Sequence, residues 1–299
     1  MPATKSTATS STAAIASPSA GQLRWLHLSD IHFWGKNDWK DEAARRKLIT
    51  LLKDKFADGS LPKPDLIFCT GDIAQGETKP NELAAQYASA QKFFDQVLQT
   101  CGLAKERLFV VPGNHDVNRN SVNAIFQKGL RGEGLASIAD SWAKQDNVFD
   151  DALKRMHEYA HFISTYLPHQ HPSDDEKARL CYRHVQEING LRIGIAGFNS
   201  AWSCYDDHDQ NQLWLAGEWQ FNAADTAFHD KTDVRIGLMH HPVSWLQAEE
   251  STLAKKRIRS QFHFWLHGHE HEAWVTPTDG EVMIAAGAVN AKSDSEFGI

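Results

Sequence analysis

The sequence predicts an α/β fold in which mixed sheets pack face to face and helices cover the outside. Three observations lead to this prediction. Short apolar runs alternate with helical patterns between residues 22 and 111, and later strand-like runs have fewer helices between them. A long polar stretch with helical spacing separates these two sets of strands. Alternation of strands and helices is typical of layered α/β domains, in which a sheet buries its faces against other layers.

The first half of the chain contains three expected strands and two expected helices. Leucine and tryptophan are frequent in the first strand, and the first helix carries apolar residues at helical spacing. Asn81 can cap the second helix, and Gly102 lies just past its end. In order, the strands are Leu23–Leu28, Asp65–Thr70 and Leu108–Val111, and the helices cover residues 40–56 and 81–101.

Residues 117–185 are polar, charged and mostly helical in pattern. Their apolar residues recur with rough helical periodicity, so we expect a helical insertion or cap on the main domain. Strand patterns return after this stretch, and one further helix is expected between residues 215 and 230. The later strands are Leu191–Phe198, Val234–Met239, Phe262–Leu266 and Val282–Ala286.

Length and composition indicate one large domain. A chain of 299 residues with 41% apolar composition can bury a sizeable core. Residues 1–21 are rich in Ser, Ala and Thr and are expected to form a disordered tail, which leaves residues 22–299 as the domain. The pattern near Ile299 resembles the start of another strand, so a continuation into further domains stays open.

Charge and cysteine usage exclude several classes of protein. A net charge of −7 and a pI near 6.1 argue against a general electrostatic grip on nucleic acid. No run approaches the length of about eighteen apolar residues that a membrane helix needs, and the N-terminus does not resemble a secretory signal. The four cysteines are widely spaced, which favours free thiols in the cytoplasm over a disulfide framework.

Five strand-like runs each end in polar side chains that can bind metal. In α/β sheets such side chains gather outside the carboxyl ends of the strands, so we expect the five clusters to meet at one edge. Two of the clusters contain paired histidines, and 16 histidines occur in all. The clusters are Ser29–His32, Gly71–Asp72, Gly113–Asp116, His240–Pro242 and His267–His271.

The residue types in these clusters fit hard to borderline divalent cations. Imidazoles suit Zn, Fe, Mn and Ni, and carboxylates suit Mn and Mg. No thiol occurs in the five loops, which argues against a structural zinc site. Seven of the side chains in these clusters are candidate ligands: Asp30, His32, Asp72, Asn114, His240, His269 and His271. These two carboxylates, one amide and four imidazoles are too many for one ion and suit two ions that share a carboxylate. Two metal ions bound side by side can neutralise phosphate oxygens and hold a bridging hydroxide.

The ordered set D-x-H, G-D, G-N-H-D, H-H-P and G-H-x-H closely resembles the calcineurin-like metallophosphoesterases, from about Leu26 to about Ala288. The resemblance implies a four-layer α/β/β/α sandwich of two mixed sheets, with outer helices. It also implies two divalent metal ions, with Mn, Fe, Zn and Ni as candidates and Mn expected to support activity in vitro. The reaction would be phosphoester hydrolysis by a metal-bridging hydroxide.

The resemblance also assigns a role to individual residues. One metal would be bound by Asp30, His32 and His271, and the other by Asn114, His240 and His269. Asp72 would bridge the two metals. His115 would protonate the leaving oxygen or stabilise charge there, and Asp116 would orient His115.

Three nearby groups are expected to support the site without binding metal. Strand alternation lets only one of His240 and His241 face the metals, so His241 is expected behind the ligands or facing the substrate. His267 is expected to be structural. Asn199 and Ser200 follow a strand and are candidates to line the pocket.

The motifs specify the substrate less closely than the chemistry. They look most similar to bacterial cyclic-nucleotide-phosphodiesterase-like enzymes, which favours a nucleotide or another small phosphoester as the partner. A DNA nuclease of the same superfamily and a non-catalytic scaffold are the alternatives, and the oligomeric state stays open. A nuclease could use the basic residues of the insertion, and a nucleotide could stack on an aromatic residue. The basic candidates are Arg119, Lys128, Arg131, Lys154 and Arg155, and the aromatic ones are Trp34, Trp39, Trp202 and Tyr205.

Overall fold

The computed structural model of the chain describes residues 21–34, 39–77, 82–121, 123–206, 208–278 and 280–289. The predicted tail over residues 1–21, except Gly21, and the predicted further strand near Ile299 lie outside these ranges. Asn81, the expected helix cap, also lies outside them. No helix in the described ranges has both the length and the apolar composition that crossing a membrane requires.

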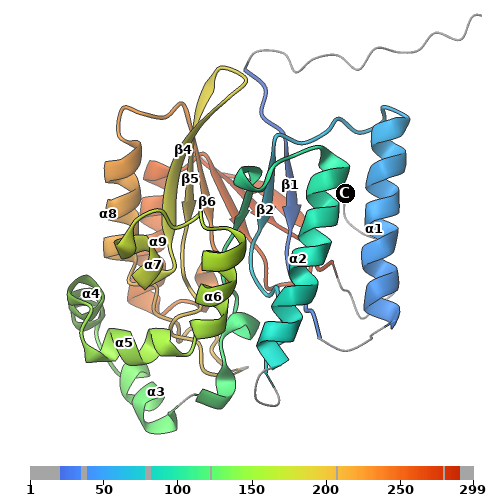
Figure 1. Ribbon diagram of the computed structural model, residues 1–299. Coiled ribbons are helices and arrows are strands. Elements are labelled where there is room, and N and C mark those ends of the chain that lie inside the picture. The colour runs from blue at the N-terminus through green and yellow to red at the C-terminus, as the bar shows by residue number, and fades with distance from the viewer. Residues whose placement is uncertain are drawn as a thin grey trace, which may run out of the picture.

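The first sheet contains three parallel strands in the order β1-β2-β3. They are β1 (Trp25–Leu28), β2 (Leu66–Cys69) and β3 (Leu108–Val110). The crossover helices α1 (Trp39–Ala57) and α2 (Glu82–Cys101) lie side by side on one outer face (Figure 1). Because all three strands are parallel, their carboxyl ends lie at one edge of the sheet.

The second sheet is mixed and has the order β4-β5-β6-β7-β9-β8. Its two edge strands, β4 and β8, run antiparallel to their neighbours, and the inner pairs are parallel. The helices α8 (Gly217–Phe228) and α9 (Ala248–Gln261) lie together on its outer side (Figure 1). The strands are β4 (Tyr182–Ile188), β5 (Leu191–Gly197), β6 (Val234–Leu238), β7 (Phe264–His267), β8 (Trp274–Pro277) and β9 (Val282–Ala285).

Alternation along β2 shows how the layers pack. All four of its residues are fully buried, because both faces of the strand are covered. Leu66 and Phe68 belong to the cluster between the two sheets, together with residues such as Ile195 and Ile236. Ile67 and Cys69 belong to the larger cluster beneath the helices. This two-sided burial produces four layers in the order helix, sheet, sheet, helix.

Five helices occupy most of the predicted insertion. They pack on the main domain rather than apart from it, since α6 contacts α2 and α4 contacts α8. Trp142 of α4 is buried, and its ring centroid lies 5.0 Å from that of Trp202. The helices are α3 (Ala124–Arg131), α4 (Leu135–Lys144), α5 (Asn147–Lys154), α6 (His157–Tyr166) and α7 (Asp174–Arg179).

The predicted fold class is confirmed, with differences in detail. The first sheet is parallel in its described part, whereas both sheets were expected to be mixed. The helix α9 and the strands β4 and β8 were not predicted from the sequence. The first four residues of β4 fall within the range predicted for the insertion, residues 117–185. The four cysteines are buried free thiols, as predicted. Short 3-10 helices cover Lys105–Arg107, Asn114–Asp116, Arg119–Ser121 and Val243–Trp245.

Candidate metal centre

The loops that follow β1, β2, β3, β6 and β7 are hydrogen-bonded to one another at one edge of the fold. Ile31 N donates to Asp72 O over 2.9 Å, and Gly268 N donates to His240 O over 3.0 Å. His269 N donates to Asp30 Oδ2 over 3.0 Å, which joins the loops of the two sheets. These contacts bring together all seven side chains that were predicted to bind metal.

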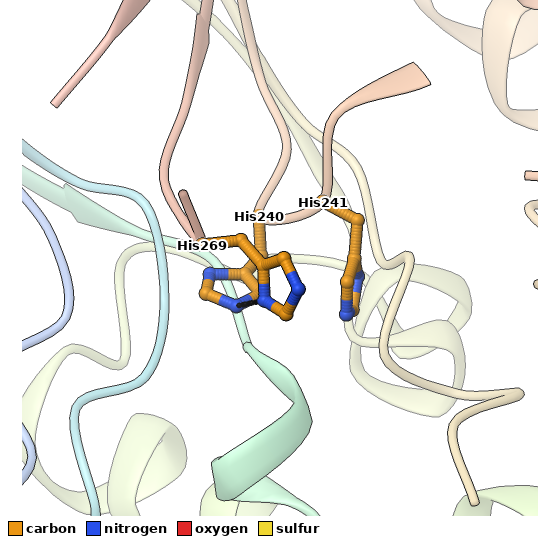
Figure 2. Close-up of side chains that lie close together, drawn as sticks. All are labelled: His240, His241 and His269. Carbon is orange, nitrogen blue, oxygen red and sulfur yellow. Dashed lines mark hydrogen bonds between the residues drawn. The ribbon is translucent and has the colours of Figure 1, made fainter. Parts of the chain in front are cut away.

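Three of these side chains meet in a tight triangle. Asn114 Oδ1 lies 3.1 Å from His240 Nε2 and 3.1 Å from His269 Nδ1, and the two nitrogens are 3.2 Å apart. Figure 2 shows the rings of His240 and His269 close together, with His241 beside them. Ligands bound at about 2.1 Å to one divalent ion are separated by about 3.0 to 3.4 Å at right or tetrahedral angles. The triangle therefore has the dimensions of three ligands around one ion.

The tautomer of His240 suits a metal ligand. Its Nδ1 lies 2.7 Å from the carbonyl oxygen of Thr70. A carbonyl can only accept, so Nδ1 carries a proton, and Nε2 is the nitrogen that a metal would bind. Sequence reasoning missed Thr70, because its contribution is a backbone carbonyl that every residue type carries.

A second group contains Asp30, His32 and His271. Asp30 is fully buried, and its Oδ1 has no hydrogen-bond partner and lies 3.3 Å from His271 Nε2. Both ring nitrogens of the buried His32 also lack a partner. Buried polar atoms are nearly always paired, so these atoms suit a set of metal ligands. A cation bound to these atoms would satisfy them.

Asp72 lies between the two groups. Its Oδ2 is 3.4 Å from His240 Nε2 and 3.8 Å from His32 Nε2. Its Oδ1 accepts a hydrogen bond of 2.9 Å from His115 N. The Asp72 carboxylate therefore lies within 4 Å of a histidine of each group, as the bridging role requires.

The electrostatics of the site favour added positive charge. Burial raises the pKa of Asp72, but His240 and His115 outweigh it and hold that pKa well below the usual range. Burial lowers the pKa of His240, but Asp72 and Asp30 outweigh it and raise that pKa to about 9. Two buried carboxylates thus hold an extra positive charge on a histidine. A divalent ion could replace that proton, since ligand imidazoles must be neutral.

Five of the seven side chains project from a left-handed backbone. The φ angles are 53° at Asp30, 53° at His32, 50° at Asp72, 72° at His269 and 61° at His271. Residues other than glycine adopt this conformation uncommonly, and Asp and His are among those that tolerate it best. Such strain clusters at functional sites, where the surrounding structure enforces it. The backbone thus turns sharply at each position to aim the side chain inward.

Two glycines allow the loops to approach each other. Gly71 has φ +94°, and a Cβ there would lie 2.6 Å from His240 Nδ1. A Cβ on Gly113 would lie 2.2 Å from Asp72 Oδ1 and 2.4 Å from Asp72 N. Neither contact is possible for a real side chain, so both positions require glycine for close packing.

His115 lies at the edge of the second group and is partly exposed. Its ring centroid is 4.8 Å from that of His32. Its Nδ1 lies 2.6 Å from the carbonyl oxygen of Gln75. Because that carbonyl accepts, Nδ1 carries the proton in the neutral ring, and Nε2 is left for a substrate.

The predicted contact between Asp116 and the His115 ring is wrong. Asp116 is fully buried and accepts from Gly113 N at 2.9 Å, Ala74 N at 3.0 Å and Tyr87 Oη at 3.0 Å. Burial and Asp72 raise its pKa to about 6 against these hydrogen bonds. Asp116 therefore ties the second and third loops together, and the backbone carbonyl of Gln75 orients His115.

His241 lies beside the ligand triangle, with a ring nitrogen within 4.8 Å of ring nitrogens of His240 and His269, but both of its ring nitrogens also contact other side chains. Its Nδ1 lies 2.8 Å from Ser200 Oγ, and its Nε2 lies 3.6 Å from Cys204 Sγ. Its ring packs 4.8 Å from the ring of His269. Ser200, proposed to line the pocket, is buried behind the ligands instead, and so is Asn199, whose Oδ1 accepts from Ala201 N and Trp202 N.

The other groups singled out in the sequence have different surroundings. His267 is buried, with its Nδ1 3.1 Å from Gly268 O, which suits a structural role. Trp202 is buried in the core, whereas Trp34 and Tyr205 are partly exposed. The side chain of Trp39 lies outside the described part of the chain.

Three of the five basic residues proposed for a nuclease surface contact other groups of the protein. Arg155 is buried and donates to Trp202 O at 2.6 Å and to Cys204 O at 2.7 Å. Arg131 is ion-paired with Asp209, and Lys154 with Asp151. At least three of the five predicted cations are thus engaged by the protein itself.

Comparison with known proteins supports the same relationship. A family model described as calcineurin-like phosphoesterase matches residues 23–273. The uncharacterized metallophosphoesterase-like protein YydB of Bacillus subtilis (strain 168) is 20% identical over 258 residues, which are 84% of this chain and 49% of that protein. The chain therefore spans about half the length of this curated relative.

Two solved structures are also similar. The protein TT1561 of Thermus thermophilus has 14% identity and a TM-score of 0.47, over 90% of this chain and 91% of that one. Phosphopantetheinyl hydrolase from Mycobacterium tuberculosis has 12% identity and a TM-score of 0.44, over 90% and 91%. The family match covers most of the chain and all five clusters, so this chain belongs to the calcineurin-like phosphoesterases.

Proposed function

We propose that this chain is a two-metal phosphoester hydrolase that acts as a phosphodiesterase on a nucleotide or cyclic nucleotide. The observation that carries the proposal is the meeting of two ligand groups at one carboxylate, Asp72. One group is a triangle with the dimensions of a cation site, and the other contains buried polar atoms without partners. Both features are explained by divalent ions.

The family depends on a dinuclear metal centre, and the residues present fit one. Asp30, His32 and His271 would hold one ion, and Asn114, His240 and His269 the other, with Asp72 shared. Bound ions would neutralise phosphate oxygens and acidify a coordinated water. Manganese is the metal we propose for activity in vitro, with iron, zinc and nickel as alternatives.

His115 is proposed to protonate the leaving oxygen. Its position beside His32 places it at the edge of the phosphate site. The Gln75 carbonyl fixes the proton on Nδ1, so a second proton on Nε2 can pass to the substrate. Positioned acids of this kind contribute about 10²- to 10⁴-fold in rate.

A nucleotide substrate has two aromatic candidates for base stacking. Trp34 follows His32 by two residues and is partly exposed. Tyr205 is partly exposed as well, and the Arg131 guanidinium lies 5.1 Å from its ring centroid. Stacking on either ring would favour a nucleotide over a simple alkyl phosphate.

The test is metal analysis together with a substrate panel on manganese-loaded protein. The panel compares cyclic nucleotides, bis-p-nitrophenyl phosphate, phosphomonoesters and linear DNA. We expect two ions per chain, diester hydrolysis that a chelator abolishes, and turnover of a cyclic or linear nucleotide. His115→Ala should retain both ions and lose about 10²- to 10⁴-fold in turnover.

The matched control is His229→Ala, since His229 is exposed at the C-terminal end of α8. This variant should leave metal content and turnover unchanged. If His115→Ala loses metal to the same extent as activity, the proposed role of His115 as the acid is wrong. A loaded protein inert toward the whole panel would instead support the scaffold alternative, and DNA cleavage alone would support the nuclease.

A further inference from the structure

Gln86 is a buried polar residue inside α2, and it is bonded to the loop that follows β2. Its side chain is 1% exposed. Its Oε1 accepts from Gln75 N at 3.0 Å and from Gly76 N at 3.2 Å. Its Nε2 donates to Gly76 O at 2.8 Å. One side chain therefore holds three backbone groups of two successive residues.

The same loop supplies the hydrogen-bond acceptor of His115. The Gln75 carbonyl lies 2.6 Å from His115 Nδ1. Gln86 thus holds the amide N–H of Gln75, while the carbonyl of that residue holds the imidazole. A shift of the loop would move or remove the acceptor, and the proton could then occupy either ring nitrogen.

The loop lies directly against His115. Gly76 has φ +100°, and a Cβ there would lie 3.5 Å from His115 O and 3.6 Å from His115 Nδ1. The backbone therefore passes directly against the histidine. Because Gln86 lies in the interior of α2 rather than at a terminus, its side chain is not needed to satisfy the ends of that helix.

We propose that Gln86 is a positioning residue that fixes the Nδ1–H tautomer and the orientation of His115. This inference rests on the proposed role of His115 as the acid that protonates the leaving group. Outer partners of this kind usually change activity by about 10- to 100-fold when removed. Gln86 should therefore act on the proton-transfer step and leave metal content unchanged.

The first experiment reads the tautomer directly and does not depend on activity. The full chain is labelled with ¹⁵N-histidine and loaded with zinc, which is diamagnetic, and long-range ¹⁵N–¹H correlation spectra are recorded. The signal of His115 is assigned by its loss in His115→Gln. We expect the Nδ1–H tautomer in the wild type and a mixture of tautomers in Gln86→Leu.

The matched control is Gln96→Leu, the same substitution at an exposed position of the same helix. It should keep the wild-type tautomer of His115. If Gln86→Leu folds and also keeps that tautomer, the proposal is overturned. If it does not fold, Gln86→Glu decides, since this change keeps both acceptor contacts and loses the donor to Gly76 O. A partial tautomer shift then supports the proposal, and an unchanged spectrum overturns it.

The second experiment uses the leaving group. Phenyl and p-nitrophenyl phosphodiesters are compared on the manganese-loaded protein, because the poorer phenolate leaving group needs protonation more. For Gln86→Leu we expect kcat to fall about 10- to 100-fold on the phenyl ester, with a smaller loss on the p-nitrophenyl ester and KM unchanged. In a His115→Ala background, Gln86→Leu should have no further effect.

Equal losses on both esters would overturn the positioning role, because a general structural defect affects both alike. Failure of the proposed function would look different. A wild-type protein that hydrolyses neither ester, with the tautomer still shifted in Gln86→Leu, would refute the role of His115 while supporting the contact through Gln86.

Discussion

Gly113→Ala should disrupt the metal centre although it adds a single methyl group. Gly113 follows β3 and packs against the backbone of Asp72, the residue that we propose bridges the two ions. Its φ angle is −108°, so alanine is not excluded by backbone conformation. The substitution is opposed only by the overlap of the new Cβ with atoms of Asp72.

The size of the clash sets the expected effect. The added Cβ would lie 2.4 Å from Asp72 N, and ordinary contacts begin at 3.4 Å. One of the two loops must therefore move by about 1 Å. Overpacking of this kind costs about 1–3 kcal/mol, and a displacement of about 1 Å at a reacting centre can reduce the rate by about 100-fold.

Denaturant unfolding with chelator present measures the first effect, and metal analysis with diester turnover measures the second. We expect metal-free Gly113→Ala to lose about 1–3 kcal/mol in unfolding free energy. It should also bind fewer than two ions and lose at least about 100-fold in turnover. Gly129→Ala is the control, because a Cβ inside α3 would meet nothing within 4 Å. It should gain about 0.5–1 kcal/mol and keep both ions.

A Gly113→Ala protein with two bound ions and turnover close to that of the wild type would refute this reasoning. The loops would then be soft enough to absorb the methyl group. The rigid spacing that we infer between Asp72 and the third loop would be unnecessary.

Three further predictions concern stability. Glu250→Gln should cost about 1–3 kcal/mol in urea unfolding, because buried Glu250 accepts from three backbone N–H groups at the start of α8. Arg155→Met should cost about 1–3 kcal/mol and leave any DNA affinity unchanged, since Arg155 is held inside the protein. Burial lowers the pKa of His171 to about 3, so its contribution is complete above pH 6.5 and is lost as the pH falls towards 3. When the pH is lowered from 7 to 5, the unfolding free energy of His171→Phe should therefore fall by about 2 kcal/mol less than that of the wild type. Urea unfolding at each pH measures this difference.

The ligand set could be predicted because it depends on a rule of topology. The carboxyl ends of neighbouring parallel strands meet at one edge, so residues far apart in sequence, such as Asp30 and His269, could be expected to converge. The layered α/β fold followed from the alternation of strands and helices, and the four-layer arrangement from the resemblance to the family. Both predictions depend only on residue types and their order along the chain, so they could be made without knowing how the elements pack.

Edge elements were missed because their burial is one-sided or weak. In β4 only Tyr182 and Ile188, the first and last residues, are fully buried, and charged residues lie between them. Three of the four residues of β8 are exposed. The buried face of α9 includes Glu250 and Gln261, so its pattern lacks the apolar periodicity of a typical helix.

The contacts that orient the site were invisible for a different reason. Gln86 and Asp116 bind backbone N–H and C=O groups of distant loops, and every residue carries such groups. Helical spacing places Gln86 on the buried face of α2 and Gln96 off it, but it does not show which groups the Gln86 side chain binds. Only the packing of α2 against the loop after β2 assigns their different roles.

The left-handed ligands have a consequence for the evolution of this chain. Each holds an unfavourable backbone shape at a cost of about 1 kcal/mol or more, and glycine would remove that cost. A lineage released from selection on hydrolysis should therefore gain thermal resilience by drifting to glycine at positions such as His32 and His271. Descendants without hydrolytic activity should then have a higher melting temperature than an active ancestor. The positions where histidine was replaced by glycine would be those where the metal site had been kept at the expense of stability.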